Sequence, residues 1–239
     1  MPDNSTVKLA PARPRSRRNR RLAFFAVLVG VAACLHGRIL QSLAELLVVD
    51  EPRSAAQAVL MISGESRFDV AEKLHNDGTK VVFILRGHSG RLERMGILPS
   101  IEQLTRRELL ARGIPESNLS LLSDEPVASS RVGALLSDRL REHTQWHIAV
   151  LCDRFSTRKW RLLLQRSADP RLLSRIHLIA LPERGFDETN WWHSKPGARA
   201  ILNGYLRLVF TWWHDGLQPA GRECTPADFE AAFTRKTTP

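Results

Sequence analysis

The sequence predicts an α/β protein: a Rossmann-like, three-layer domain with a mainly parallel five-stranded sheet, preceded by an N-terminal transmembrane helix. Solid apolar runs recur at intervals of roughly 25 to 40 residues, the spacing of βαβ units, and helix signals follow each run. An uncharged run directly after an Arg-rich tail predicts the transmembrane helix. The 239 residues, 43% of them hydrophobic, suffice for one such domain and argue against a disordered or repeat protein.

Most of the positive charge lies in residues 1–21, which we expect to be a cytosolic tail. The chain carries a net charge of +10, and this tail holds seven Lys or Arg against one Asp, which leaves +4 for the remainder. A basic tail before an apolar run is typical of a targeting signal, so we expect no nucleic acid partner. Three widely spaced cysteines without a C-x-x-C pair argue against a disulfide framework and a zinc site, and we expect no metal.

Residues 22–38 are the predicted membrane anchor. The run LAFFAVLVGVAACL at 22–35 has no charge, but its fourteen residues are fewer than the about 20 that cross a bilayer as a helix, so we extend the anchor to Arg38. A cleaved signal peptide, lipidation at Cys34 in the lipobox-like Val-Ala-Ala-Cys, and a buried core helix are the alternatives. The anchor predicts a single-pass protein of the inner (cytoplasmic) membrane whose soluble domain is extracytoplasmic.

The anchor precedes a short stalk. Apolar residues repeat at helical spacing from Ile39 to Leu47, which predicts an amphipathic stalk over residues 39–52, ended by Pro52. The α/β domain then covers 53–214, and 215–239 is a C-terminal tail.

The five expected strands are predominantly apolar, as in strands that are covered on both faces. They are 58–62, 81–85, 119–122, 148–151 and 176–181. The helix signals are a cap at Ser66–Asp69 with Gly78 as the stop, a capping box at Ser100–Gln103 with an end at Gly113, Pro126 opening a helix through Leu140, and Asp153 capping a helix with Trp160, Leu163 and Leu164. A last helix is expected over 196–213, and the pairs Trp191-Trp192 and Trp212-Trp213 flank it at its two ends. Core packing is the favoured role of these rings, and membrane-interface contact is the alternative.

Arginines recur where the strands are expected to end. In parallel sheets, ligands bind beyond the carboxyl ends of the strands, and guanidinium groups near helix N-termini suit a phosphate or carboxylate. The predicted ligand-binding residues are Gly64, Arg67, Arg86, Gly87, Ser129, Ser130, Arg131 and Arg158. The alternative is that these arginines are solvated or paired with neighbouring carboxylates.

The order of several segments carries a family resemblance. The segments are LLVVDEP, AAQAVLMISGESR, KVVFILRGHSG, ARGIPESNLSLLSDEPVASSRVGALL, IAVLCDRFSTRKWRLLLQR and WWHSKPGARAILNGYLRLVFTWW. Over roughly residues 45–213 the chain resembles the YdcF-like family, which includes the SanA and ElyC envelope proteins. The resemblance implies a Rossmann-like domain, commonly behind a membrane anchor, with a role in cell-envelope, peptidoglycan or lipid-carrier metabolism and no defined reaction.

The family's site residues are only partly present. Gly64 and Arg67 match its glycine turn after the first strand, and Gly87 matches the turn after the second. Ser129 or Ser130 matches its hydroxyl position, and Arg158 ends its aromatic-x-x-Arg element. A family histidine is replaced by Ser156 and an acidic or amide position by Gly133, and neither residue can act as a general acid or base.

Three functions remain open. The first is an envelope protein that binds an anionic or phosphorylated small molecule or lipid-linked precursor. The second is a hydrolase or transferase that uses groups such as Ser129, Ser130, His88, Asp153 or Glu183, and the third is a scaffold with a degenerate site. The retained arginines and the two lost positions favour the first. The chain lacks G-x-G-x-x-G, P-loop, H-E-x-x-H and G-x-S-x-G motifs. The sequence therefore leaves the cofactor unknown.

Overall fold

The computed structural model describes residues 24–25, 30, 36–51, 56–64, 66–87 and 91–214. The basic tail, most of the expected anchor and the C-terminal tail lie outside these residues. Within the described ranges, no helix is both long enough and apolar enough to cross a membrane. The anchor therefore stays a prediction.

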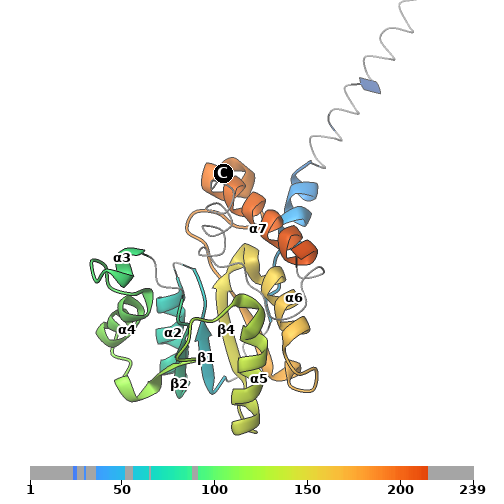
Figure 1. Ribbon diagram of the computed structural model, residues 1–239. Coiled ribbons are helices and arrows are strands. Elements are labelled where there is room, and N and C mark those ends of the chain that lie inside the picture. Colours follow the sequence, from blue (N-terminus) through green and yellow to red (C-terminus); the bar gives the residue numbers. More distant parts are fainter. Residues whose placement is uncertain are drawn as a thin grey trace, which may run out of the picture.

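A five-stranded parallel sheet forms the centre of the domain, in the order β3-β2-β1-β4-β5 (Figure 1). Its strands are β1 (Ala58–Met61), β2 (Val81–Ile84), β3 (Leu119–Leu121), β4 (Ile148–Asp153) and β5 (Ile176–Leu181). Ala58 is level with Val81 of β2 and with Ile148 of β4. The predicted α/β class and the parallel five-stranded sheet are confirmed.

Helices cover both faces of the sheet. They are α2 (Arg67–Asn76), α3 (Arg91–Arg94), α4 (Ile101–Ala111), α5 (Val132–Glu142), α6 (Thr157–Ser167) and α7 (Lys195–His214). Alternate β1 residues show the layering, since Val59 packs with apolar residues of α2 and α4, whereas Leu60 packs with those of α5 and α6. Right-handed crossovers explain this, because the chain moves across the sheet in one direction from β1 to β3 and in the other from β4 to β5.

Some of the helix starts and ends predicted from local sequence signals agree with the structure, and others do not. The Ser100–Gln103 capping box forms in both directions, and Gly113 follows α4 at a φ of +83°. The expected helix from Pro126 begins only at Val132, after the 3-10 turn η2 (Ser129–Arg131). Asp153 precedes the 3-10 turn η3 (Arg154–Ser156) and makes no side-chain cap, so α6 begins at Thr157. These two expectations placed the helix starts too early.

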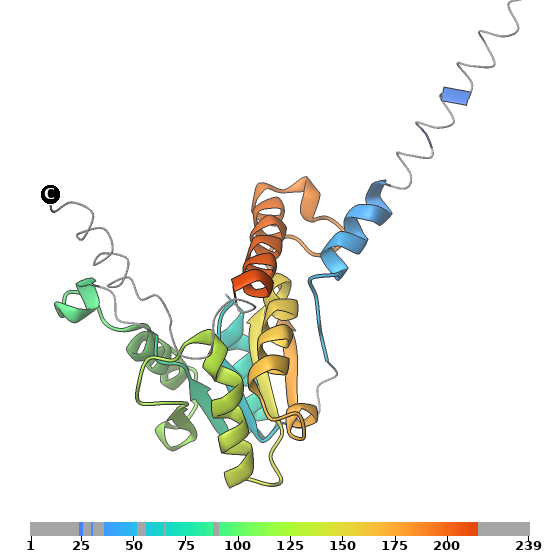
Figure 2. The ribbon, with the colours of Figure 1, turned by 45° about the vertical axis from the view of Figure 1, so that its right-hand side comes forward.

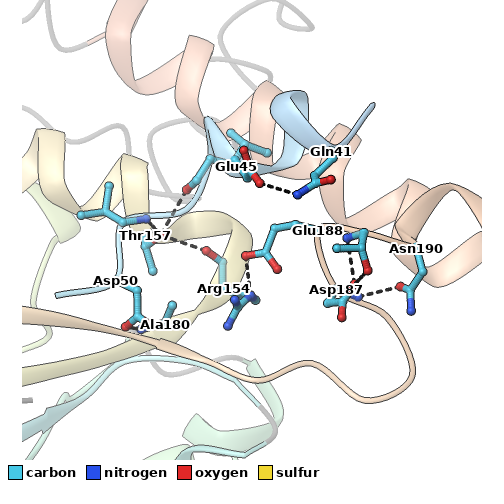
Figure 3. Close-up of polar contacts among 12 residues, drawn as sticks. Gln41, Glu45, Asp50, Arg154, Thr157, Ala180, Asp187, Glu188 and Asn190 are labelled. Atoms are coloured by element: carbon cyan, nitrogen blue, oxygen red, sulfur yellow. Dashed lines mark hydrogen bonds and ion pairs between the residues drawn. The ribbon is translucent and has the colours of Figure 1, made fainter. Parts of the chain in front are cut away.

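Residues 36–51 pack against the domain. Residues 36–45 form a helix that lies beside α7 in both views (Figures 1 and 2). The Tyr205 hydroxyl donates to the Leu43 carbonyl at 2.6 Å, and the Trp191 indole donates to the Leu40 carbonyl at 3.1 Å. The buried Thr157 hydroxyl accepts from the Val49 amide at 2.7 Å (Figure 3). The segment expected to be a stalk is therefore part of the packed unit over its described residues.

A small third core joins this segment to α7. It contains the buried side chains of Ala44, Leu47, Phe155 and Ile201. Gly204 of α7 lies against it, where an added Cβ would be 2.7 Å from the Phe155 carbonyl oxygen and 2.9 Å from Cδ1 of Leu47. The absence of a side chain at Gly204 therefore sets how closely α7 approaches η3 and the N-terminal segment.

We predict that Gly204→Ala destabilises the protein by about 1–3 kcal/mol, the usual cost of overpacking. In an unconstrained helix the same change stabilises by about 0.5–1 kcal/mol, so the sign of the effect is diagnostic. Thermal unfolding of the purified protein measures it, with Asn203→Ala as the control on the same helix. A Gly204→Ala protein as stable as the parent would contradict the packing.

Candidate functional site

The carboxyl ends of β1 and β4 form the topological switch point of the sheet. The chain leaves β1 toward β2 and returns to the other side of β1 as β4, so the loops after these two strands diverge. Ligands of open parallel sheets bind in the crevice that such loops leave. The residues that follow the two strands here are Ser63 and Gly64 after β1, and Arg154 after β4, whose last residue is Asp153.

Gly64 brings the turn after β1 close to β4 and β5. Its φ is +109°, and an added Cβ would lie 2.5 Å from Cδ1 of Leu181 and 3.3 Å from Oδ1 of Asp153. The Ser63 hydroxyl accepts from the Asp153 amide at 3.4 Å. The Ser66 hydroxyl donates to the Pro182 carbonyl at 3.0 Å instead of capping α2. Only glycine fits this turn, and its backbone lies next to the Asp153 carboxylate.

The loop after β5 is fastened to the end of β4. Arg154 forms an ion pair with Glu188, with Nε 2.7 Å from Oε1 (Figure 3). The rings of Phe155 and Phe186 stack with centroids 6.0 Å apart. Hydrogen bonds from the Thr189 hydroxyl and amide lower the pKa of Asp187 and keep the loop's turn closed. The Arg154–Glu188 pair therefore holds the loop after β5 against the end of β4.

Two of the predicted arginines are available to a ligand. Arg67 is the first residue of α2, and its guanidinium carbon lies 4.7 Å from the centroid of the neighbouring Phe68 ring. Arg131 is exposed at the end of η2, next to the exposed Ser129 and Ser130. Among the residues that the structure describes, neither arginine forms an ion pair with a carboxylate.

The other two predicted arginines have partners. Arg86 follows β2, donates to the Asp124 carbonyl at 2.6 Å and lies 3.6 Å from Glu102. Arg158 donates through Nε to the Leu46 carbonyl at 2.9 Å and through its amide to the Leu47 carbonyl at 3.0 Å. Arg158 thus contacts the N-terminal segment. Gly87 is exposed beside residues 88–90, which include His88 and lie outside the described residues.

The two positions that depart from the family pattern have packing roles. The buried Ser156 hydroxyl donates to the Asp153 carbonyl at 2.9 Å. An added Cβ at Gly133 would lie 2.7 Å from the Ala168 amide nitrogen and would also meet Oγ of Ser167. Both residues therefore hold the backbone around α5, β4 and α6, and neither offers a titratable group.

The thiol and the possible metal ligands near the carboxyl edge of the sheet limit the reactions that the site could support. Burial raises the pKa of the Cys152 thiol, so it stays protonated and unreactive near neutral pH. Within the described part of the chain, no group of three or more His, Cys, Asp or Glu could hold a metal ion. The contacts of Glu188 and Phe186 were missed by sequence reasoning, because no local pattern links a loop after β5 to the end of β4.

Comparison with known proteins adds no identification: no family model, curated protein or solved structure matches the chain. The resemblance to the YdcF-like family therefore rests on the order of sequence segments alone.

A group of titratable residues lies at the opposite, amino-terminal edge of the sheet. Nδ1 of His147 and Nε2 of His177 are 3.1 Å apart, and the two rings stack. Glu51 lies 3.7 Å from His177 and 3.0 Å from Arg161. Burial, His147 and Arg161 lower the pKa of His177, against the opposing effect of Glu51. The folded protein therefore favours a neutral His177.

We predict that the protein loses stability as the pH falls. Because folding lowers the pKa of His177, the unfolded chain binds more protons once the pH drops below the ordinary histidine value of about 6.5. The urea midpoint should therefore fall between neutral and mildly acidic pH. His177→Gln should flatten this dependence, whereas His193→Gln, at an exposed position, should leave it unchanged. Equal pH dependence in both variants would refute the assignment.

Proposed function

We propose that the protein is a membrane-anchored component of the cell envelope that binds an anionic, phosphorylated ligand at the carboxyl edge of its sheet. The observation that carries the proposal is the switch point itself. There the glycine turn at Gly64 leads directly into α2, whose first residue, Arg67, has a guanidinium group with no carboxylate partner among the described residues.

The charges at the switch point favour one orientation of the ligand. A phosphate near the start of α2 would accept from backbone amides and pair with Arg67. The exposed Arg131, Ser129 and Ser130 lie on η2, after the edge strand β3, and we propose them as further donors to a ligand that extends from the switch point in that direction. The Asp153 carboxylate beside Gly64 would repel a second anion, so an uncharged donor such as a sugar hydroxyl suits that side.

The membrane part of the proposal rests on the chain before residue 36. The uncharged run 22–35 follows the Arg-rich tail, and Phe24 and Phe25 are 71% and 63% exposed. Residues 36–51 pack on the domain, so the anchor and the domain are joined without a long linker.

We predict that residues 1–21 face the cytosol and residues 50–239 lie outside it, because positively charged flanks stay inside. Protease added to spheroplasts should remove an epitope fused after Pro239 and leave one fused before Met1 intact. The reverse pattern would overturn the orientation. Mass spectrometry of the N-terminus distinguishes an intact anchor from cleavage or lipidation at Cys34.

We predict that Arg67→Ala weakens binding of a phosphorylated ligand by about ten-fold or more, since a charge-assisted hydrogen bond contributes about 1.5–3 kcal/mol. Calorimetric titration of the full chain in detergent, with pyrophosphate, a nucleotide-linked sugar and a polyprenyl phosphate as probes, measures this. Arg171→Ala is the matched control, an exposed arginine before β5 and hence at the opposite edge of the sheet.

The same titrations separate the three functions. If the parent binds none of the probes, or if Arg67→Ala binds as tightly as the parent, the site is not an anion site. The interpretation as a scaffold with a degenerate site is then favoured. Turnover of a probe that disappears in Ser129→Ala or Ser130→Ala would favour a hydrolase or transferase.

A further inference from the structure

Helix α7 carries a second apolar face that is largely exposed. Its inner face includes the buried Ile201, Gly204 and Thr211, which pack toward the domain and the N-terminal segment. At about 100° per residue, a set of large side chains lies on the opposite side. These are Leu202, Leu206, Val209, Phe210 and Trp213, which are 54–65% exposed, and Trp212 on their flank is 65% exposed. A contiguous exposed stripe of this size marks an interaction surface, unlike single exposed apolar residues.

The charges of α7 identify the kind of surface that it fits. The helix carries the exposed cations Lys195, Arg199 and Arg207 and has no Asp or Glu along its length. Aromatic and aliphatic side chains beside lysine and arginine are typical of helices that lie in the interface of an anionic bilayer. Tryptophan rings in particular favour that zone.

The position of α7 in the fold supports the same conclusion. The Tyr205 hydroxyl holds the Leu43 carbonyl, and burial raises the pKa of Tyr205, which keeps it a hydrogen-bond donor. Leu43 is only five residues after Arg38, the end of the expected anchor, and five helical residues span about 7.5 Å. Interfacial helices insert about 5–10 Å into the headgroup region, so α7 lies within reach of the bilayer. Ile39 and Leu46 on the adjoining helix and turn are also exposed, at 59% and 57%.

We propose that the exposed face of α7 rests on the anionic lipid surface of the membrane, so that the domain is held against the bilayer and does not hang freely from its anchor. This inference depends on the anchoring part of the proposed function. It assigns a second, peripheral membrane contact to a helix far from the anchor in sequence.

Two other occupants fit the chemistry less well. A symmetric contact with a second copy would bring the cations of two α7 helices together without a carboxylate on either helix to offset them. The 25 residues after His214 contain three large apolar side chains, Leu217, Phe229 and Phe233, which are too few to cover the stripe.

The test uses the full chain reconstituted in vesicles of phosphatidylethanolamine and phosphatidylglycerol that contain lipids brominated in the acyl chains. Bromine quenches tryptophan emission at short range, so the parent should be quenched. Trp212→Phe/Trp213→Phe should lose more than about half of the quenchable emission, because interfacial rings lie at the acyl boundary. Trp146→Phe should retain it, since Trp146 stacks on His143 and lies just before β4 at the opposite edge of the sheet.

A second pair of variants tests the apolar face directly. Leu206→Gln/Phe210→Gln should reduce the quenching of the tryptophans about as strongly as their removal, because polar side chains weaken interfacial insertion. Met95→Gln/Leu98→Gln is the matched control, since these residues are similarly exposed, at 60% and 51%, on the segment before α4. Equal loss in the control would overturn the proposal, because exposed hydrophobicity in general would then explain the effect.

Several outcomes separate this inference from its basis. If the chain resists carbonate extraction but the α7 variants are quenched like the parent, anchoring stands and the α7 contact is wrong. If carbonate releases the chain, the anchoring itself fails. If quenching appears only when the chain is cut after His214, the C-terminal residues cover the face. If the parent cross-links as a dimer and Leu206→Gln/Phe210→Gln does not, a second copy covers it. Each of these results overturns the membrane contact.

Discussion

Strands β1 and β4 are buried on both faces over Ala58–Met61 and Ile148–Cys152, so the middle of the sheet has no room for a polar side chain. In a parallel sheet the backbone groups of such strands pair with their neighbours, and chemistry is confined to the strand ends. The carboxyl ends of β1 and β4 diverge because the chain crosses from one side of β1 to the other. The candidate site, with Gly64 and Asp153 at its centre, exists because of this reversal.

The exposed edge of the sheet explains why residues 36–51 belong to the domain. Strand β5 is an edge strand, and unpaired edge amides invite aggregation unless something covers them. The Asp50 carboxylate accepts from the Ala180 amide at 3.1 Å, and Glu51 exchanges hydrogen bonds with Leu178. The chain that blocks this edge also reaches Thr157 and α7. The segment that would otherwise be a linker therefore closes the sheet and carries the C-terminal helix.

The candidate site at the switch point and helix α7 are connected through the loop after β5. The loop after β5 is fastened to β4 by Arg154 and Glu188 and leads into α7, whose inner face packs on η3 and the N-terminal segment. The switch point is therefore joined to α7 through the loop of residues 182–194, and α7 in turn packs against residues 36–51. Under the proposed function, this packing, and not a flexible tether, would fix the height of a bound ligand above the bilayer.

The sequence by itself determined the five strands, the Ser100–Gln103 capping box and the glycine turns at Gly64 and Gly113, because apolar runs and caps act over a few residues. It also placed Arg67 at the start of a helix. Only the tertiary structure decided which arginines are available: Arg86 and Arg158 have backbone partners at Asp124 and Leu46, which are 38 and 112 residues away. It likewise decided that Gly133 and Gly204 serve close packing and that one face of α7 is exposed. Such contacts join segments distant in sequence, and no local periodicity encodes a partner that only folding brings near.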